Sequence, residues 1–200
     1  MAALPACSVR LPLRDGTPAL FRQVAADDKE RLRAAMALLS PRSRYLRFHG
    51  PVTALSPERL RFLTEVDQLD HVAWCAFDED HAELPMVGVG RWVRLPDQPA
   101  IAESALTVID AYQGRGVATL LLALLNEAAA AGGVKTLRSL VLGDNQRFIA
   151  TLVSYGATAR HDSGGMMCVD LPVYGAADGI RNATYARAIA AVRERLATPG

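Results

Sequence analysis

Residues 110–122, DAYQGRGVATLLL, place two glycines directly before a leucine-rich run, and this junction constrains the fold more than any other stretch. Gly114 and Gly116 permit backbone conformations that other residues avoid. A helix that begins near Gly116 presents unpaired N–H groups and the positive end of its dipole, which together favour phosphate binding. Arg115 should add a mobile cation. The stretch therefore predicts an anion site at a helix N-terminus.

The segments around this junction predict a mixed sheet. Two short strands should flank Asp15-Gly16. Three helices should follow. The first spans 27–39 and is capped by Asp27 or Asp28, the second is short and starts at Ser40-Pro41, and the third spans 56–66 and is capped by Ser56. Strands at 71–77, 85–95 and 100–109 read as an antiparallel meander. After the leucine-rich helix, which should stop at Gly132-Gly133, the pattern gives a strand at 136–142, a helix at 144–156, short strands at 157–161 and 166–171, and a tail helix at 177–197.

Composition excludes several classes of function. The formal net charge is +1 and 50% of the residues are hydrophobic, so neither nucleic acid nor a membrane surface is expected as a partner. No apolar run approaches the roughly 20 residues of a membrane helix, and the first ten residues do not resemble a signal peptide. Three scattered cysteines and four scattered histidines indicate neither a disulfide framework nor a metal site. We expect a cytoplasmic protein.

Two familiar phosphate loops do not fit the junction. No lysine follows the glycines, as the nucleoside-triphosphate loop requires. Thr119 stands where a dinucleotide fingerprint needs its third glycine, and the preceding strand belongs to a meander. The alternative interpretation of the two glycines is an ordinary turn before a core helix. That interpretation gives no reason for Gln113 and Arg115.

The spacing Gln113-x-x-Gly116-x-Ala118 resembles the Q/R-x-x-G-x-G/A signature of the GNAT superfamily of acyl-CoA-dependent N-acyltransferases. The segment LVLGDNQRFIATLVSYGA resembles the strand, asparagine and helix that follow in that family. LSPRSRYLRFHGP and LTEVDQLDHVAWCAF are similar to the acetyltransferase domain of bacterial Pat-type protein lysine acetyltransferases. The resemblance spans about residues 15–172. It implies an α/β fold with a GNAT-like mixed, mostly antiparallel sheet flanked by helices, and an additional C-terminal helix. We place the acetyltransferase domain at 1–174 and a helical appendage at 175–200.

The resemblance also implies a site for acetyl-CoA, without a metal. The loop 113–119 would cradle the pyrophosphate, the strand segment 106–108 would pair with the pantetheine arm, and Asn145 would contact the arm from the next helix. The cofactor-binding residues expected on this basis are Leu106, Thr107, Val108, Gln113, Gly114, Arg115, Gly116, Val117, Ala118, Thr119 and Asn145.

Glu103 is the candidate catalytic residue. Acyl transfer to an ammonium group needs a base, and a carboxylate inside an apolar strand beside the thioester would serve. The alternative is a solvent-facing glutamate near a strand end. Leu152 occupies the position at which many GNAT enzymes carry a tyrosine, so a tyrosine general acid is in doubt, and Tyr155 is read as a packing residue.

Three functions remain open from the sequence. The first is acetylation of a protein lysine, with Arg42, Arg44 and Arg47 on the acceptor side or simply on a solvated basic face. The second is acetylation of a small amine, and the third is an acyl-CoA-binding sensor without catalysis. The apolar face of the tail helix must pack on the domain or on a partner, and a homodimer is one option.

Overall fold

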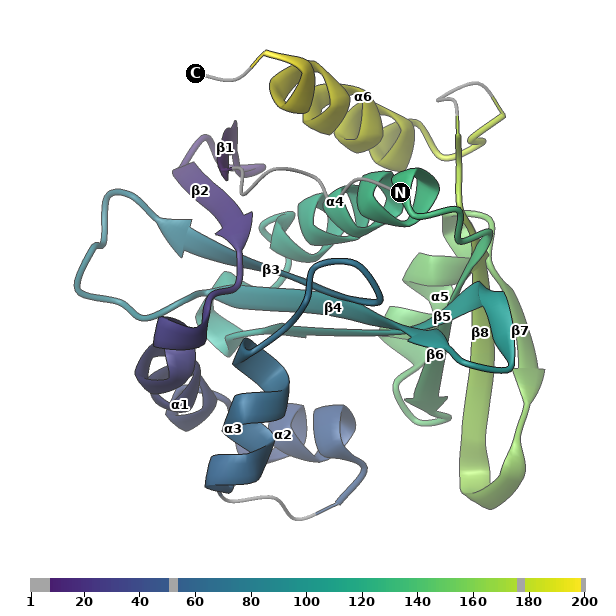
Figure 1. Ribbon diagram of the computed structural model, residues 1–200, viewed down its shortest axis with the longest axis horizontal. Helices are drawn as coiled ribbons and strands as arrows, with labels where there is room; N and C mark the ends of the chain where they lie inside the picture. Colours follow the sequence, from purple (N-terminus) through teal and green to yellow (C-terminus); the bar gives the residue numbers. More distant parts are fainter. Residues whose placement is uncertain (1–7, 51–53, 176–178, 199–200) are drawn as a thin grey trace.

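The computed structural model describes residues 8–50, 54–175 and 179–198, and one eight-stranded sheet organises them (Figure 1). Its order is β1-β2-β3-β4-β5-β6-β8-β7. The strands are β1 (Ser8–Pro12), β2 (Pro18–Gln23), β3 (His71–Asp78), β4 (Gly88–Leu95), β5 (Gln98–Val108), β6 (Thr136–Leu142), β7 (Thr158–His161) and β8 (Met166–Pro172). All neighbouring pairs are antiparallel except β5–β6, which is parallel. The expected mixed, mostly antiparallel sheet is confirmed.

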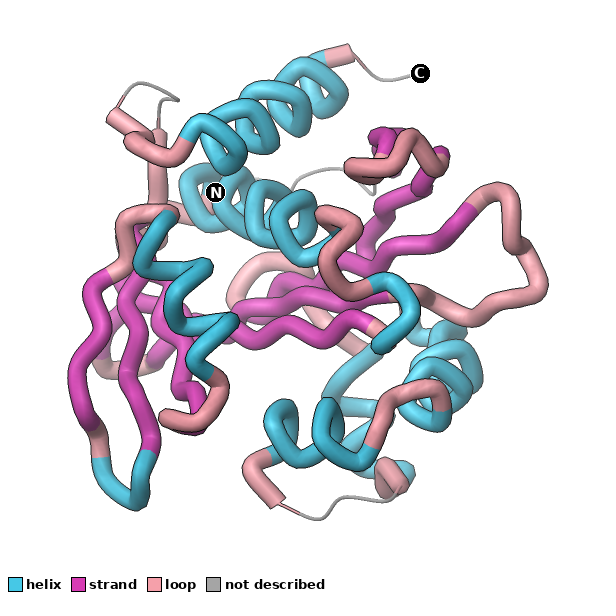
Figure 2. The backbone as a smooth tube through the Cα atoms, turned by 180° about the vertical axis from the view of Figure 1, so that it is seen from behind, coloured by secondary structure: helices cyan, strands magenta, loops and turns pink. Residues whose placement is uncertain are grey.

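Helices cover both faces of the sheet. The helices α1 (Lys29–Ala37), α2 (Pro41–Phe48) and α3 (Pro57–Thr64) lie on one face, and α4 (Val117–Ala131) and α6 (Ala183–Ala197) lie on the other, as both ribbon views show (Figures 1 and 2). The helix α5 (Gln146–Ser154) packs beside β7 and β8. The core therefore has two apolar layers, one on each side of the sheet.

The expected serine caps are confirmed, whereas the expected aspartate caps are wrong. Ser40 and Ser56 accept hydrogen bonds from the third residue of their helices, at 3.1 and 3.2 Å. Asp28 precedes α1 but makes no cap bond. Its carboxylate instead accepts both guanidinium N–H groups of Arg22, at 2.7 and 2.6 Å, because this ion pair satisfies a side chain that is only 1% exposed.

The helix α6 packs against the domain itself. Tyr185, Ile189 and Val192 are fully buried, and α6 lies along α4 and beside β1 (Figure 1). It begins at Ala183, where Asn182 caps it by accepting from the N–H groups of Thr184 and Tyr185. The expected segment 177–182 is therefore not helical over its described residues, and 177–178 lie outside them.

Candidate active site

A cleft of about 610 Å³ opens where β5 and β6 separate. The two strands pair only from Ile101–Thr136 to Glu103–Arg138. One residue further on, the hydroxyls of Ser104 and Ser139 hydrogen bond at 2.8 Å, and beyond them the strands diverge. Of the expected site residues, all except Arg115 and Val117 line this cleft.

Beyond its pairing with β6, which ends at Glu103, the strand β5 turns backbone groups toward the cleft. Ile109 donates to Val87 on the β4 side, and the hydrogen bonds of an antiparallel pair alternate along the strand. Thr107 therefore directs its N–H and C=O toward β4, whereas Leu106 and Val108 direct theirs into the cleft. The exposed backbone edge matches an extended amide chain such as pantetheine.

The loop before α4 has the geometry of an anion cradle. Gly114 and Gly116 have φ values of 80° and 96°, in the left-handed region that favours glycine. Leu120 is the first residue whose N–H bonds back to Gly116, at 3.1 Å, so the N–H groups before it have no helical acceptor. The N-terminus of a 15-residue helix thus faces the cleft.

The expectation that Arg115 is a mobile cation is wrong. Its guanidinium binds Asp15 and Thr17, both at 2.6 Å, and lies over the Tyr112 ring. The hydrogen bond to the arginine lowers the pKa of Asp15 to about 2. Arg115 therefore joins the β1–β2 hairpin to the loop, and only its main chain remains for a phosphate.

Two other arginines lie beside the loop, and no pattern in the sequence pointed to them. Arg14 and Arg147 both line the cleft. A Cβ atom added to Gly114 would lie 3.4 Å from the Arg147 guanidinium. A Cβ atom added to Gly116 would lie 3.7 Å from the Arg14 backbone nitrogen. Among the described residues neither guanidinium has an ion-pair partner. These are the cations that would meet the phosphates of CoA.

Gln113 links the loop to the helix α2. Its amide donates to the Val108 carbonyl and to the Ser43 hydroxyl, both at 3.2 Å. Asp110 accepts from the Ser43 and Ser40 hydroxyls, at 2.9 and 2.8 Å. These bonds hold the N-terminus of α2, which has no fully buried residue of its own, against the end of β5.

Glu103 lies in the middle of β5, where the pairing with β6 ends, and is exposed to the cleft. It shares the lining with Arg47 and His49 from the end of α2. Burial and repulsion by Arg59 lower the pKa of Arg47 to about 10, and the Glu103 charge opposes that shift. The Glu103 carboxylate has no ion pair or hydrogen bond to a described residue, so it is free to meet an amine.

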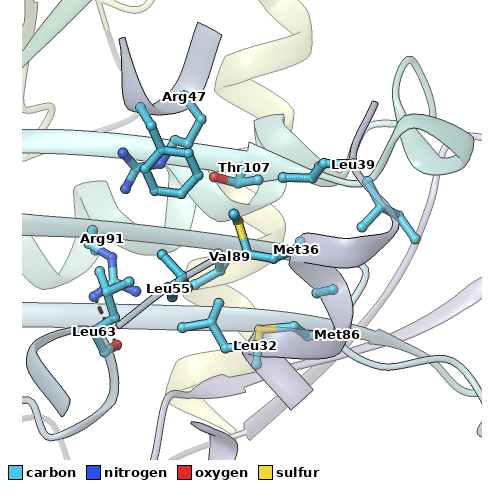
Figure 3. Close-up of a pocket in the computed structure, with 14 residues that line it drawn as sticks. Leu32, Met36, Leu39, Arg47, Leu55, Leu63, Met86, Val89, Arg91 and Thr107 are labelled. Carbon is cyan, nitrogen blue, oxygen red and sulfur yellow. Dashed lines mark hydrogen bonds between the residues drawn. The ribbon is translucent and has the colours of Figure 1, made fainter. Parts of the chain in front are cut away.

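A small apolar cavity of about 30 Å³ lies under the sheet, between β4 and the helices α1 to α3 (Figure 3). Arg47 and Arg91 enter it from the same side, opposite Leu39 and Met86. Arg91 is 5% exposed and donates to the Leu63 carbonyl and toward His71 Nε2, at 2.9 and 3.1 Å. Burial and the neighbouring charge of Arg91 lower the pKa of His71 to about 4, so a neutral imidazole accepts this bond.

Tyr155 does more than pack. It is 6% exposed and stacks on Tyr185 with ring centroids 4.5 Å apart, as a packing residue would. Its hydroxyl also lines the cleft and bonds the Thr119 hydroxyl at 2.9 Å. Leu152 is buried in the core and does not line the cleft.

The cleft extends to Asn182 and Thr184 at the start of α6. From the sequence, this helix is expected to be an appendage.

These features define an acyltransferase of the GNAT class. The family model described as "Acetyltransferase (GNAT) family" matches residues 34–156, and the chain belongs to this family. It is therefore an acetyltransferase whose co-substrate is acetyl-CoA, which agrees with the glycine cradle, the free edge of β5 and the flanking arginines.

Among its relatives, Acetyltransferase Pat of Mycolicibacterium smegmatis is 33% identical over 82% of this chain. The chain spans about half (49%) of that protein. Acetyltransferase PA5475 of Pseudomonas aeruginosa is 29% identical over 75% of the chain and 80% of its own length. The crystal structure of the GNAT domain of S. lividans PAT superposes with a TM-score of 0.76 at 29% identity, covering 82% of this chain and 96% of that one. The resemblance to Pat-type acetyltransferases is thus confirmed.

The described residues contain neither a candidate metal site nor a helix that could span a membrane. No group of three or more histidine, cysteine, aspartate or glutamate side chains could hold a metal ion there. Within the same ranges, no helix has the length and apolar character needed to cross a bilayer.

Proposed function

We propose that the protein transfers the acetyl group of acetyl-CoA to a lysine side chain of a protein, with Glu103 as the general base. One observation carries the proposal: Glu103 is exposed in the cleft on β5, on the strand whose free backbone edge would hold the thioester arm. The resemblance to Pat-type protein lysine acetyltransferases supports lysine as the acceptor.

The base addresses the largest obstacle to the reaction. A lysine with a pKa of ~10.4 is neutral in about one molecule in 2,500 at pH 7, equivalent to roughly 4.6 kcal/mol. A carboxylate that takes the ammonium proton, directly or through one water, leaves the amine lone pair free to attack the thioester carbon. The nitrogen–carbon bond forms and the carbon–sulfur bond breaks, so that CoA departs as the thiolate. The second proton of the attacking nitrogen is released to water and the thiolate takes one from water, which leaves the amide and the CoA thiol.

The cofactor would be held at three places. The N–H groups around Gly114 and Gly116, with Arg14 and Arg147, would bind the phosphates. The backbone of Leu106 and Val108 would pair with the pantetheine arm, and a backbone N–H near Val108 would hold the thioester carbonyl. The side chain of Asn145, which makes no cap bond in α5, is free to contact the arm. The cytoplasmic location and the homodimer remain predictions.

Replacing Glu103 tests the base. In Glu103→Gln we expect kcat for a lysine peptide to fall by about 10²–10³-fold, the scale of general base catalysis, while the KM for acetyl-CoA stays within about twofold because no cofactor contact is lost. The rate of the variant should keep rising with pH, as the amine loses its own proton. Thiol release and peptide mass, followed from pH 6 to 10, measure both effects.

Glu30→Gln is the matched control, since Glu30 is an exposed glutamate on α1, outside the cleft. It should leave kcat and the pH profile unchanged. An unaltered pH profile in Glu103→Gln would remove Glu103 from the base role. Turnover of small amines but of no lysine peptide would assign the enzyme to metabolite acetylation, and tight CoA binding without any turnover would make it a sensor.

A further inference from the structure

Arginines outnumber carboxylates around the acceptor end of the cleft. Arg47 lines it with a single carboxylate, Glu103, and with His49, whose pKa is lowered by burial and by the Arg47 charge, so that its imidazole is neutral at pH 7. Arg91 lies directly beneath, in the cavity that Arg47 also enters (Figure 3). Arg59 on α3, Arg47 and Arg91 are close enough to repel one another. The pKa of Arg91 is lowered to about 9 by burial and by the charges of Arg47 and Arg59. The field in this region is therefore strongly positive.

No described carboxylate forms an ion pair with these guanidinium groups, and the Glu103 charge only partly offsets that of Arg47. Arg91 contacts only a carbonyl and a neutral imidazole. The Arg47 guanidinium lies over the Phe48 ring, 5.1 Å from its centroid, and has no ion pair or hydrogen bond within residues 8–50, 54–175 and 179–198. A partly buried guanidinium without a partner is costly, so its retention favours an anion that arrives with a ligand.

The cofactor does not supply that anion. Its phosphates belong at the glycine loop, where Arg14 and Arg147 already lie. From Val108, beside that loop, to Glu103 the strand β5 runs roughly 16 Å. The acetyl group that reaches the Glu103 end carries no charge. The anion for Arg47 must therefore belong to the acceptor.

We propose that the acceptor carries a carboxylate close to its reactive amine, and that Arg47 binds this carboxylate while Glu103 takes the proton of the amine. The inference rests on the proposed function, under which the acceptor is a lysine flanked by an acidic residue. Arginine suits this role because its planar guanidinium can bind both carboxylate oxygens at once. The carboxylate also offsets the positive field that would otherwise repel an incoming ammonium group.

Lysine peptides of one length test the preference. Three capped pentapeptides differ only in the residue after a central lysine, which is aspartate, asparagine or lysine. We expect kcat/KM to be about tenfold higher for the aspartate peptide than for the asparagine peptide, the scale of one charge-assisted hydrogen bond. The preference should shrink in high salt. It should disappear in Arg47→Gln, in which the aspartate and asparagine peptides should be acetylated with equal kcat/KM.

Arg44→Gln is the matched control, because it removes the same charge from the same helix outside the cleft lining. It should keep the aspartate preference. Equal rates for the aspartate and asparagine peptides, or a preference that survives Arg47→Gln, would overturn the inference while leaving lysine acetylation intact.

A second arm separates a protein from a free amino acid as the source of the carboxylate. It compares free amino acids with their amides as acceptors. If peptides are inert but the acids are preferred over the amides, and Arg47→Gln abolishes that preference, the inference holds and the protein-lysine proposal fails. If no peptide, amino acid or amide is acetylated, both fail.

Discussion

At the scale of single residues, Asp28 shows how a buried charge is tolerated in this fold. The carboxylate is 1% exposed, but it accepts two hydrogen bonds from Arg22 and one from the Ala25 N–H. Burial alone would raise its pKa, and the bonds to Arg22 and Ala25 outweigh burial and lower it. The ion pair joins β2 to the start of α1, next to the cavity helices.

Replacing Asp28 with Asn should destabilise the protein by about 3 kcal/mol, because it leaves the Arg22 guanidinium without its anion. Since folding lowers the pKa of Asp28, its contribution is complete above the unfolded pKa of ~3.9 and is lost as the pH falls through the folded value. Urea unfolding at pH 7 and pH 3 should therefore show a smaller deficit at pH 3. The exposed neighbour Asp27→Asn is the control and should stay within about 0.5 kcal/mol of wild type. Equal deficits at both pH values would contradict this account.

At the scale of elements, local signals predicted most of the fold. Ser-Pro starts, glycine stops and alternating apolar residues identified the helices and the meander, because each signal acts within a few residues. The neighbours of β8 were not predictable, since strand pairing across the chain depends on long-range packing. Arg14, Arg147 and Asn182 were missed for the same reason: each lies in a different segment, and only the folded chain brings them to one cleft.

The helix α4 has glycines with positive φ just before and just after it, which allows a paired test. Gly116→Ala and Gly133→Ala each place a side chain at a positive φ, 96° and 76°, at a cost of roughly 1 kcal/mol in stability. Only Gly116 lines the cleft. We expect calorimetry to show weaker CoA binding for Gly116→Ala and unchanged binding for Gly133→Ala, with similar losses in melting temperature. Equal CoA affinity in both variants would remove the loop from the phosphate site.

At the scale of the whole molecule, the segments outside the matched family region complete the domain. The helix α6 buries Tyr185 and Ile189 against α4, and its first residues reach the cleft. The Tyr185 ring stacks on Tyr155, whose hydroxyl holds Thr119 in the cofactor loop. The helix α6 is therefore part of the same core as the strands β5 and β6.

Ile189→Ala should cost about 2–5 kcal/mol, the usual range for a large-to-small change in a core. The exposed Arg187→Ala on the same helix should change stability by less than about 0.5 kcal/mol. Chemical denaturation measures the free energy of unfolding of both variants. CoA at a hundredfold excess over its Kd should raise that free energy by about 2.7 kcal/mol in each variant. A neutral effect of Ile189→Ala would mean that α6 is not part of the cooperative unit.

The short β5–β6 ladder has a mechanical consequence. The half-sheet β1–β5 and the half-sheet β6, β8 and β7 are joined by three residue pairs, by a backbone bond from Lys135 to the Ala100 carbonyl, and by bonds of the Ser104 hydroxyl to Ser139 and to the Arg138 carbonyl. This ladder can act as a hinge, and the cleft beyond it extends for roughly 16 Å of strand. A rotation of a few degrees at this ladder would displace the mouth by more than an ångström, and would therefore change the width through which a thioester enters and a thiol leaves.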